Sequence, residues 1–190
     1  MDRIKIRELL NAKMNPKRME HILGVEYTAT ALAMCYEVDL EQASLAGLLH
    51  DCAKHLSRDE KFAECRRFGI TINQFEQRNP ELLHAKLGAC YAKDIYGVED
   101  EAVLSAIICH TTGKPAMSTL DKIIYIADYI EPNRNKAPKL PMLRKLAFED
   151  LDQCLFIILE NTIEFLQGTS LAIDELTLET YEYYRTMLKK

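Results

Sequence analysis

The sequence contains little glycine or proline and no tryptophan. Its 190 residues include only seven glycines and six prolines, and runs that alternate apolar and polar residues are hard to find. Because strands and their turns depend on both signals, their scarcity favours an all-α fold. The hydrophobic content of 48% supplies a core large enough for one domain.

Other absences exclude classes of function. A net charge of −5 provides no basic field for a nucleic-acid backbone. No apolar run approaches the ~20 residues of a membrane helix, and Met1-Asp-Arg-Ile-Lys5 lacks the apolar segment of a signal peptide. The six cysteines form no CxxC pair, so we expect reduced thiols that pack as small apolar side chains. We therefore predict a cytoplasmic protein with neither nucleic acid nor membrane as a partner.

Capping signals divide the chain into helices. Asn15-Pro16 begins one helix, Asp39 with Gln42 begins the next in capping-box style, and Ser57 with Glu60 forms a capping box. The expected helical ranges are 3–12, 16–36, 40–49, 58–68, a short helix starting within 71–74, 81–96, 100–109, 119–130, a region from about 142 to 167, and 174–188. The stretch 131–141 is expected to be a functional loop. We predict a single domain over 1–190, with an N-terminal helix in 1–14 and a C-terminal helical appendage in 168–190.

The stretch Leu45–Lys54 is the most informative. An apolar helix, expected to be the buried centre of the fold, ends there in His50 and Asp51. Burying an imidazole and a carboxylate side by side is costly unless something neutralises them. A divalent metal would do so, because it takes nitrogen and oxygen ligands of this kind.

Four more polar residues interrupt apolar helices: His21, His84, His110 and Asp128. Each alone would favour a satisfied core histidine or a helix cap. Together with His50 and Asp51 they would each cost about 1–3 kcal/mol if unpaired, and shared cations would satisfy them all. Their spacing is too wide for a zinc finger or an HExxH helix and suits a site assembled between the helices of a bundle.

Six ligands exceed what one catalytic metal takes from a protein, so the inventory favours two metals with Asp51 between them. One metal would use His21, His50 and Asp128, and the other His84 and His110. Iron, manganese, cobalt and zinc suit such ligands, and magnesium is a further alternative.

The same residues carry a family resemblance. The pattern His21…His50-Asp51…Asp128 resembles the HD-domain phosphohydrolases, and five local segments over about residues 15–166 resemble the bacterial YqeK-type family. These segments are Arg18–His21, His50–Lys54, Leu83–Ala85, His110–Gly113 and Asp128–Arg134. The resemblance implies an HD-domain helical bundle and two metals, with iron in the cell. It also implies symmetrical hydrolysis of diadenosine tetraphosphate to two ADP by a metal-activated water.

The expected site therefore contains residues of three kinds. The metal ligands are the six residues above; the catalytic residues are Asp51 and Lys54; the substrate contacts are Lys54, Thr111, Thr112, Gly113 and Arg134. Other interpretations stay open for the last group: Lys54 could complement a helix dipole, Arg134 could pair with Glu131, and Gly113 could be a turn residue. Arg18 is expected to be a structural ion-pair partner.

Two other functions compete with this hypothesis. A mononuclear HD phosphohydrolase would act on nucleoside monophosphates or guanosine polyphosphates, and a sensor would bind an ADP-like nucleotide without turnover. A structural protein with buried histidines would bind no stoichiometric metal. The apolar helices late in the chain also raise the prospect of a homodimer.

Overall fold

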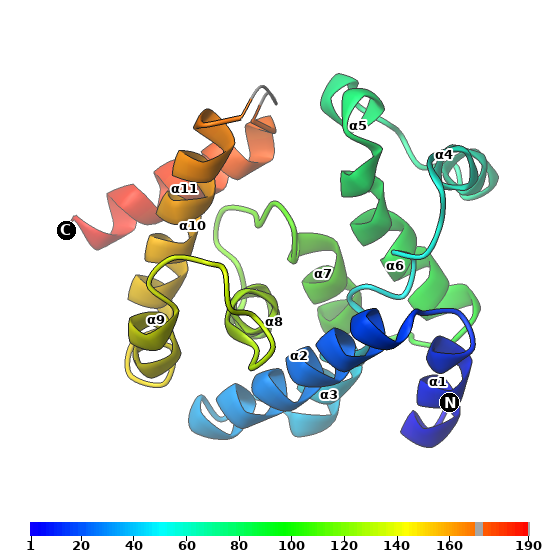
Figure 1. Cartoon of the computed structure of the whole chain (residues 1–190), viewed down its shortest axis with the longest axis horizontal. Coiled ribbons are helices and arrows are strands. Elements are labelled where there is room, and N and C mark those ends of the chain that lie inside the picture. Colours follow the sequence, from blue (N-terminus) through cyan, green and yellow to red (C-terminus); the bar gives the residue numbers. More distant parts are fainter. Residues whose placement is uncertain (170–172, 190) are drawn as a thin grey trace.

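A computed structural model describes residues 1–169 and 173–189, and all regular secondary structure in these ranges is helical (Figure 1). The helices are α1 (Arg3–Asn11), α2 (Pro16–Cys35), α3 (Leu40–Leu49), α4 (Arg58–Arg67), α5 (Gln74–Arg78), the 3₁₀ helix η1 (Pro80–Leu82), α6 (Leu83–Asp94), α7 (Glu101–Cys109), α8 (Thr119–Ile130), α9 (Leu140–Leu146), α10 (Leu151–Gln167) and α11 (Glu175–Leu188). The predicted all-α fold is confirmed. Within these ranges, none of the helices combines the length and apolarity that crossing a membrane requires.

The helix starts follow their capping residues. The side chain of Asn15 accepts a hydrogen bond from the Arg18 N–H, and Ser57 forms the expected reciprocal box with Glu60. Only one of the two hydrogen bonds predicted for the capping box at α3 forms. Asp39 accepts from the Gln42 N–H, but the Gln42 side chain donates to Asp100 Oδ2 at 2.7 Å instead.

Two other helix boundaries differ from the prediction. The range 81–96 begins with η1, and α6 starts at Leu83. The region from 142 to 167 is two helices, because the chain turns at 147–150 and the Asp150 side chain caps α10 by accepting from the Gln153 N–H. The pattern of apolar residues alone does not predict this helix start, which Asp150 marks as a capping residue.

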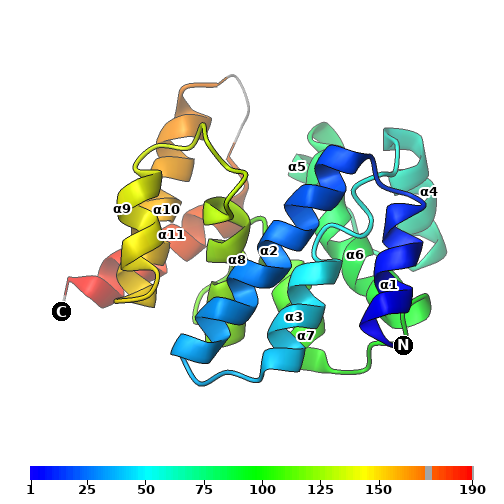
Figure 2. The ribbon, with the colours of Figure 1, turned by 60° about the horizontal axis from the view of Figure 1, so that its bottom comes forward.

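Helix α3 is central, as predicted, and packs against α2, α7 and α8. Gly47 lets α2 approach, since a Cβ there would lie 2.9 Å from the Glu26 Cα. In Figure 2 these four helices occupy the middle of the molecule, with α1, α4, α5 and α6 on one side and α9, α10 and α11 on the other. The site residues come from the middle group and from α6.

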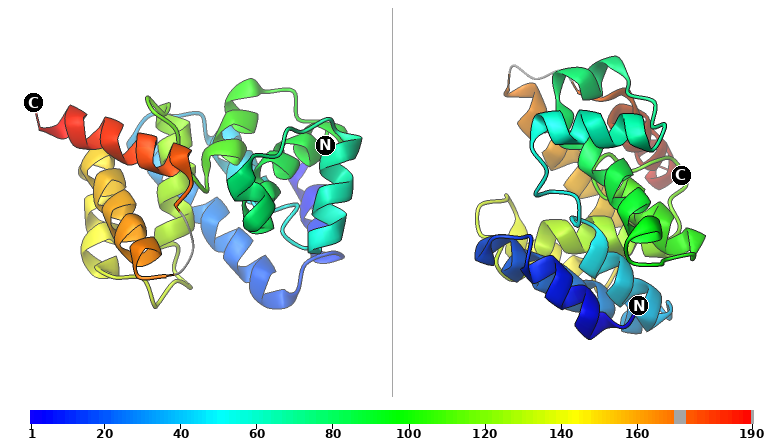
Figure 3. Two further views of the ribbon diagram at one scale, coloured as in Figure 1. Left: turned by 90° about the horizontal axis from the view of Figure 1, so that it is seen from above. Right: turned by 90° about the vertical axis from the view of Figure 1, so that its right-hand side faces the viewer.

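The C-terminal helix α11 contacts α10 and the loop that follows α7. The Tyr184 hydroxyl accepts a hydrogen bond from the Met117 N–H at 3.0 Å, and Tyr181 stacks on Phe156. Thr180 packs on Gly113, whose φ of +67° favours glycine. In the left view of Figure 3, α1 and α11 lie toward opposite ends of the molecule, yet α11 contacts the loop that follows α7.

Candidate metal centre

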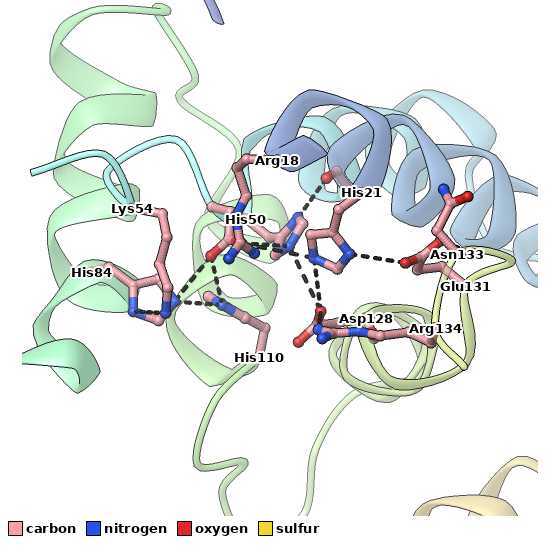
Figure 4. Close-up of polar contacts among 12 residues, drawn as sticks. Arg18, His21, His50, Lys54, His84, His110, Asp128, Glu131, Asn133 and Arg134 are labelled. Atoms are coloured by element: carbon pink, nitrogen blue, oxygen red, sulfur yellow. Dashed lines mark hydrogen bonds and ion pairs between the residues drawn. The ribbon is translucent and has the colours of Figure 1, made fainter. Parts of the chain in front are cut away.

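The six side chains expected to bind metal converge between five helices (Figure 4). They are His21 on α2, His50 and Asp51 directly after α3, His84 on α6, His110 directly after α7, and Asp128 on α8. Five are buried and Asp128 is half-buried. The packing of α3 against α2, α7 and α8 brings these side chains together from distant parts of the sequence.

Asp51 lies between two pairs of histidines, and each of its oxygens faces one pair. Oδ2 lies 3.7 Å from His21 Nε2 and 3.5 Å from His50 Nε2. Oδ1 lies 3.1 Å from His84 Nε2 and 3.7 Å from His110 Nε2. Within each trio of Asp51 and two histidines, the donor atoms lie within 4.8 Å of one another. This arrangement suits a carboxylate shared by two cations.

Asp128 makes the two parts of the site unequal. Its Oδ1 lies 3.0 Å from His21 Nε2 and 4.0 Å from His50 Nε2. We call His21, His50 and Asp128 the His21 half, and His84 with His110 the His84 half. Asp51 belongs to both, so the His21 half has two carboxylates and the His84 half has one.

The histidine rings are oriented with Nε2 toward Asp51. Three of them place Nδ1 within hydrogen-bond reach of a backbone carbonyl three residues earlier: His50 with Gly47, His84 with Glu81, and His110 with Ile107. Carbonyl oxygens only accept, so Nδ1 carries the proton and Nε2 keeps its lone pair. The buried Nε2 atoms of His21 and His50 have no hydrogen-bond partner among the described residues. Unsatisfied buried nitrogens of this kind fit metal ligation.

The protonation states also fit a cation. Burial lowers the pKa of His84 to about 4, despite the opposing effect of the Asp51 carboxylate, so this ring is neutral at pH 7. Burial raises the pKa of Asp51, but the nearby histidines outweigh it and hold this pKa well below its usual value. Burial would also raise the pKa of Asp128, but the neighbouring His21, His50 and Arg134 side chains outweigh it and lower this pKa. Metals require neutral imidazoles and ionised carboxylates of this kind.

Comparisons with known proteins agree with this geometry. The HD domain family matches residues 18–133. The symmetrical bis(5'-nucleosyl)-tetraphosphatase of Halalkalibacterium halodurans is 41% identical over 95% of this chain and 96% of its own length. This chain belongs to that HD-domain family. The corresponding Bacillus subtilis protein is 37% identical over 96% of this chain and 97% of its own. A solved structure of a predicted HD superfamily hydrolase from Clostridium acetobutylicum, 42% identical, superposes with a TM-score of 0.95 over 98% of both chains.

Three positively charged side chains surround the HD-domain site. Arg134 pairs with Asp128, Nη2 to Oδ1, at 2.7 Å, rather than with Glu131 as one interpretation held. Arg18 pairs with Asp51, Nη1 to Oδ2, at 2.7 Å, so the expected ion pair exists and lies inside the site. Lys54 Nζ lies 3.3 Å from the His84 ring and 3.5 Å from Glu81 Oε2.

The residues after His110 are less open than the sequence suggests. Gly113 is buried against Thr180, and its N–H donates to the Cys109 carbonyl at 2.8 Å. Its N–H is therefore already bonded, which favours the turn interpretation of Gly113. Thr111 and Thr112 are half-buried, and the Thr112 hydroxyl donates to the Gly113 carbonyl at 3.1 Å.

Sequence reasoning missed two residues that shape the site. Glu131 is 1% exposed and accepts a hydrogen bond from His21 Nδ1. Arg144 on α9 donates to the carbonyls of Ile130, Glu131, Pro132 and Arg134. Glu131 follows Asp128 by three residues, a spacing that places both on one helix face. Arg144 gives no comparable signal, because its contacts are all to backbone.

A cavity of about 740 Å³ opens beside the His21 half. Its charged lining consists of Lys17, Arg18 and Arg134 together with Glu20 and Glu131. Positive side chains along such a path suit a phosphate-bearing ligand. The ligand could reach the metal site from this side.

Proposed function

We propose that this chain hydrolyses diadenosine tetraphosphate symmetrically, giving two ADP. The observation that carries the proposal is the placement of Asp51, whose two oxygens face two separate histidine pairs. Relatives that match nearly the whole chain are named symmetrical bis(5'-nucleosyl)-tetraphosphatases. Two candidate metal positions beside a cavity that Lys17, Arg18 and Arg134 help to line would suit cleavage of a polyphosphate.

The six converging residues are proposed as ligands of two divalent metals. The His21 half with Asp51 would hold one, and the His84 half with Asp51 the other. Iron is the proposed metal, with manganese, cobalt, zinc and magnesium as alternatives. Bound divalent cations would lower the pKa of a water and offset charge on phosphoryl oxygens.

The chain's own groups would orient the polyphosphate. Attack by water on either of the two central phosphorus atoms, with cleavage of the bond between the second and third phosphates, releases ADP from both sides. Asp51 would hold both cations at a fixed separation. Arg134 and Arg18 would exchange their carboxylate partners for phosphate oxygens. A guanidinium group can form paired hydrogen bonds with either a carboxylate or a phosphate.

Lys54 would act from the other side of the site. Its ammonium group already faces His84, so it would stabilise negative charge on the phosphoryl group during transfer. The Thr111 and Thr112 hydroxyls would contribute weaker phosphate contacts. Cytoplasmic location and homodimer formation remain predictions from the sequence.

Product analysis tests this function. Protein purified without oxygen and loaded with iron should convert diadenosine tetraphosphate to ADP alone. His84→Ala should lose this activity, whereas His55→Ala, which changes the one histidine outside the site, should keep it. ATP and AMP as products would overturn the symmetrical assignment, and hydrolysis that survives in His84→Ala would overturn the two-metal site.

A further inference from the structure

Glu131 gives His21 a support that the other three site histidines lack. His21 Nδ1 lies 3.1 Å from Glu131 Oε1, while the other rings face backbone carbonyls. An ionised carboxylate only accepts hydrogen bonds, so Glu131 favours a proton on His21 Nδ1 and leaves Nε2 directed at Asp51 and Asp128. The charge of Glu131 also makes His21 a more basic donor than a neutral carbonyl would.

Helix α2 leaves a space for this carboxylate at Gly24. A Cβ at residue 24 would lie only 2.4 Å from Glu131 Oε2. The side chain of any other residue would therefore force the Glu131 carboxylate to move. His21 and Gly24 are three residues apart and share a helix face, so one turn of α2 supplies both the ligand and the room for its support.

Glu131 also fixes the loop that carries Arg134. Its Oε2 accepts a hydrogen bond from the Asn133 N–H at 2.6 Å. Figure 4 shows Glu131 between His21 and Asn133, with Arg134 directed back toward Asp128. The carboxylate thus connects the orientation of His21 to the position of the loop.

We propose that Glu131 is a positioning residue that sets the metal affinity of the His21 half and couples it to the 131–134 loop. This inference rests on the proposed metal site but not on the identity of the substrate. Loss of such a support group typically weakens metal binding about 10- to 100-fold. The His84 half, held by carbonyls, should be unaffected.

Cobalt titration of the metal-free protein, followed by visible absorption against a competing chelator, tests the proposal without substrate. Glu131→Gln keeps the shape and removes the charge. Gly24→Ala keeps the charge but displaces the carboxylate, because its methyl group would occupy the space of Oε2. Both should weaken one binding step about 10- to 100-fold and leave the other step unchanged. Glu26→Gln is the matched control, because Glu26 is equally buried on α2 but contacts Arg7 and Ser44.

Unchanged affinities in Glu131→Gln would overturn the proposal, as would a loss of the same size in Glu26→Gln. If the wild-type chain takes up one cobalt rather than two, the dinuclear part of the proposed function fails. The Glu131 inference is then still decided by whether that single step weakens in both variants.

Discussion

The His21 half and the His84 half share Asp51 but have different surroundings. The His21 half contains a second carboxylate, and its His21 is hydrogen-bonded to the buried Glu131. This half also opens to a cavity whose lining includes Arg18 and Arg134. The His84 half has neutral carbonyl supports, and the side chains of His84 and His110 are only 3% and 2% exposed. The more anionic half is thus the more accessible one.

This difference would suit two separate tasks within the proposed site. Two carboxylates and a charged support should bind a cation tightly, because ligand charge and outer contacts raise affinity. The adjacent arginines then offset the excess negative charge and attract phosphate. A cation held by the His84 half, with one carboxylate, would stay more positive, which would favour polarising a phosphoryl oxygen.

The largest effect should come from the residue common to both halves. Asp51→Asn should remove metal from both and lower ADP release by at least about 1,000-fold, the scale of losing the main electrostatic stabilisation. Asp128→Asn should empty only the His21 half. Metal content after gel filtration and the rate of ADP release measure both. Two metals retained in Asp51→Asn would contradict the shared-ligand geometry.

Lowering the pH should destabilise the fold of the metal-free protein through protonation of His84. The folded-state pKa of His84 is about 4 against an unfolded value of 6.5, so the unfolded chain binds more protons between these values. This contribution to stability is complete above pH 6.5 and is lost as pH falls toward 4. It amounts to about 2 kcal/mol between pH 8 and pH 5. Urea unfolding of wild type and His84→Gln measures it, and equal pH slopes would refute it.

Substitution of Arg134 and of Lys54 should change different kinetic parameters, because the two residues lie in different halves of the site. Arg134→Ala should raise KM about 10-fold, the scale of one charge-assisted hydrogen bond, because it removes a phosphate contact from the accessible half. Lys54→Ala should instead lower kcat by a similar factor. Lys145→Ala, an exposed lysine on α9, is the control. The same parameter moving in both variants would argue against two distinct tasks.

The threonines should have the smallest effect. The Thr112 hydroxyl is already bonded to a carbonyl, so Thr112→Ala should change KM by less than about 3-fold, and Thr111→Ala by no more than the ~1 kcal/mol of a neutral hydrogen bond. Steady-state kinetics on both variants checks this. A larger loss would place these hydroxyls directly on the polyphosphate.

The parts of the fold that depend on local signals could be predicted from the sequence. Caps at Asn15 and Ser57 act within one helical turn and were found correctly. Gln42 was misassigned because Asp100, distant in sequence, competes for its side chain. The α9–α10 break was missed because apolar residues continue on both sides of it.

In the site, too, contacts between residues distant in sequence are hard to predict. Buried histidines in apolar helices stand out in any sequence, so the convergence of His21 and His84 on Asp51 could be anticipated. The partners that orient them could not. Glu131 meets His21 across 110 positions of sequence, and Arg144 recognises backbone atoms, which carry no residue-specific pattern.

The docking of α11 on the loop after His110 has a consequence for how the protein is made. Synthesis proceeds from the N-terminus, and the segment matching the HD domain ends at residue 133. Tyr184 and Thr180, which contact Met117 and Gly113, are added only after that segment has been made. A nascent chain would therefore carry all six converging side chains long before the His110 loop is secured.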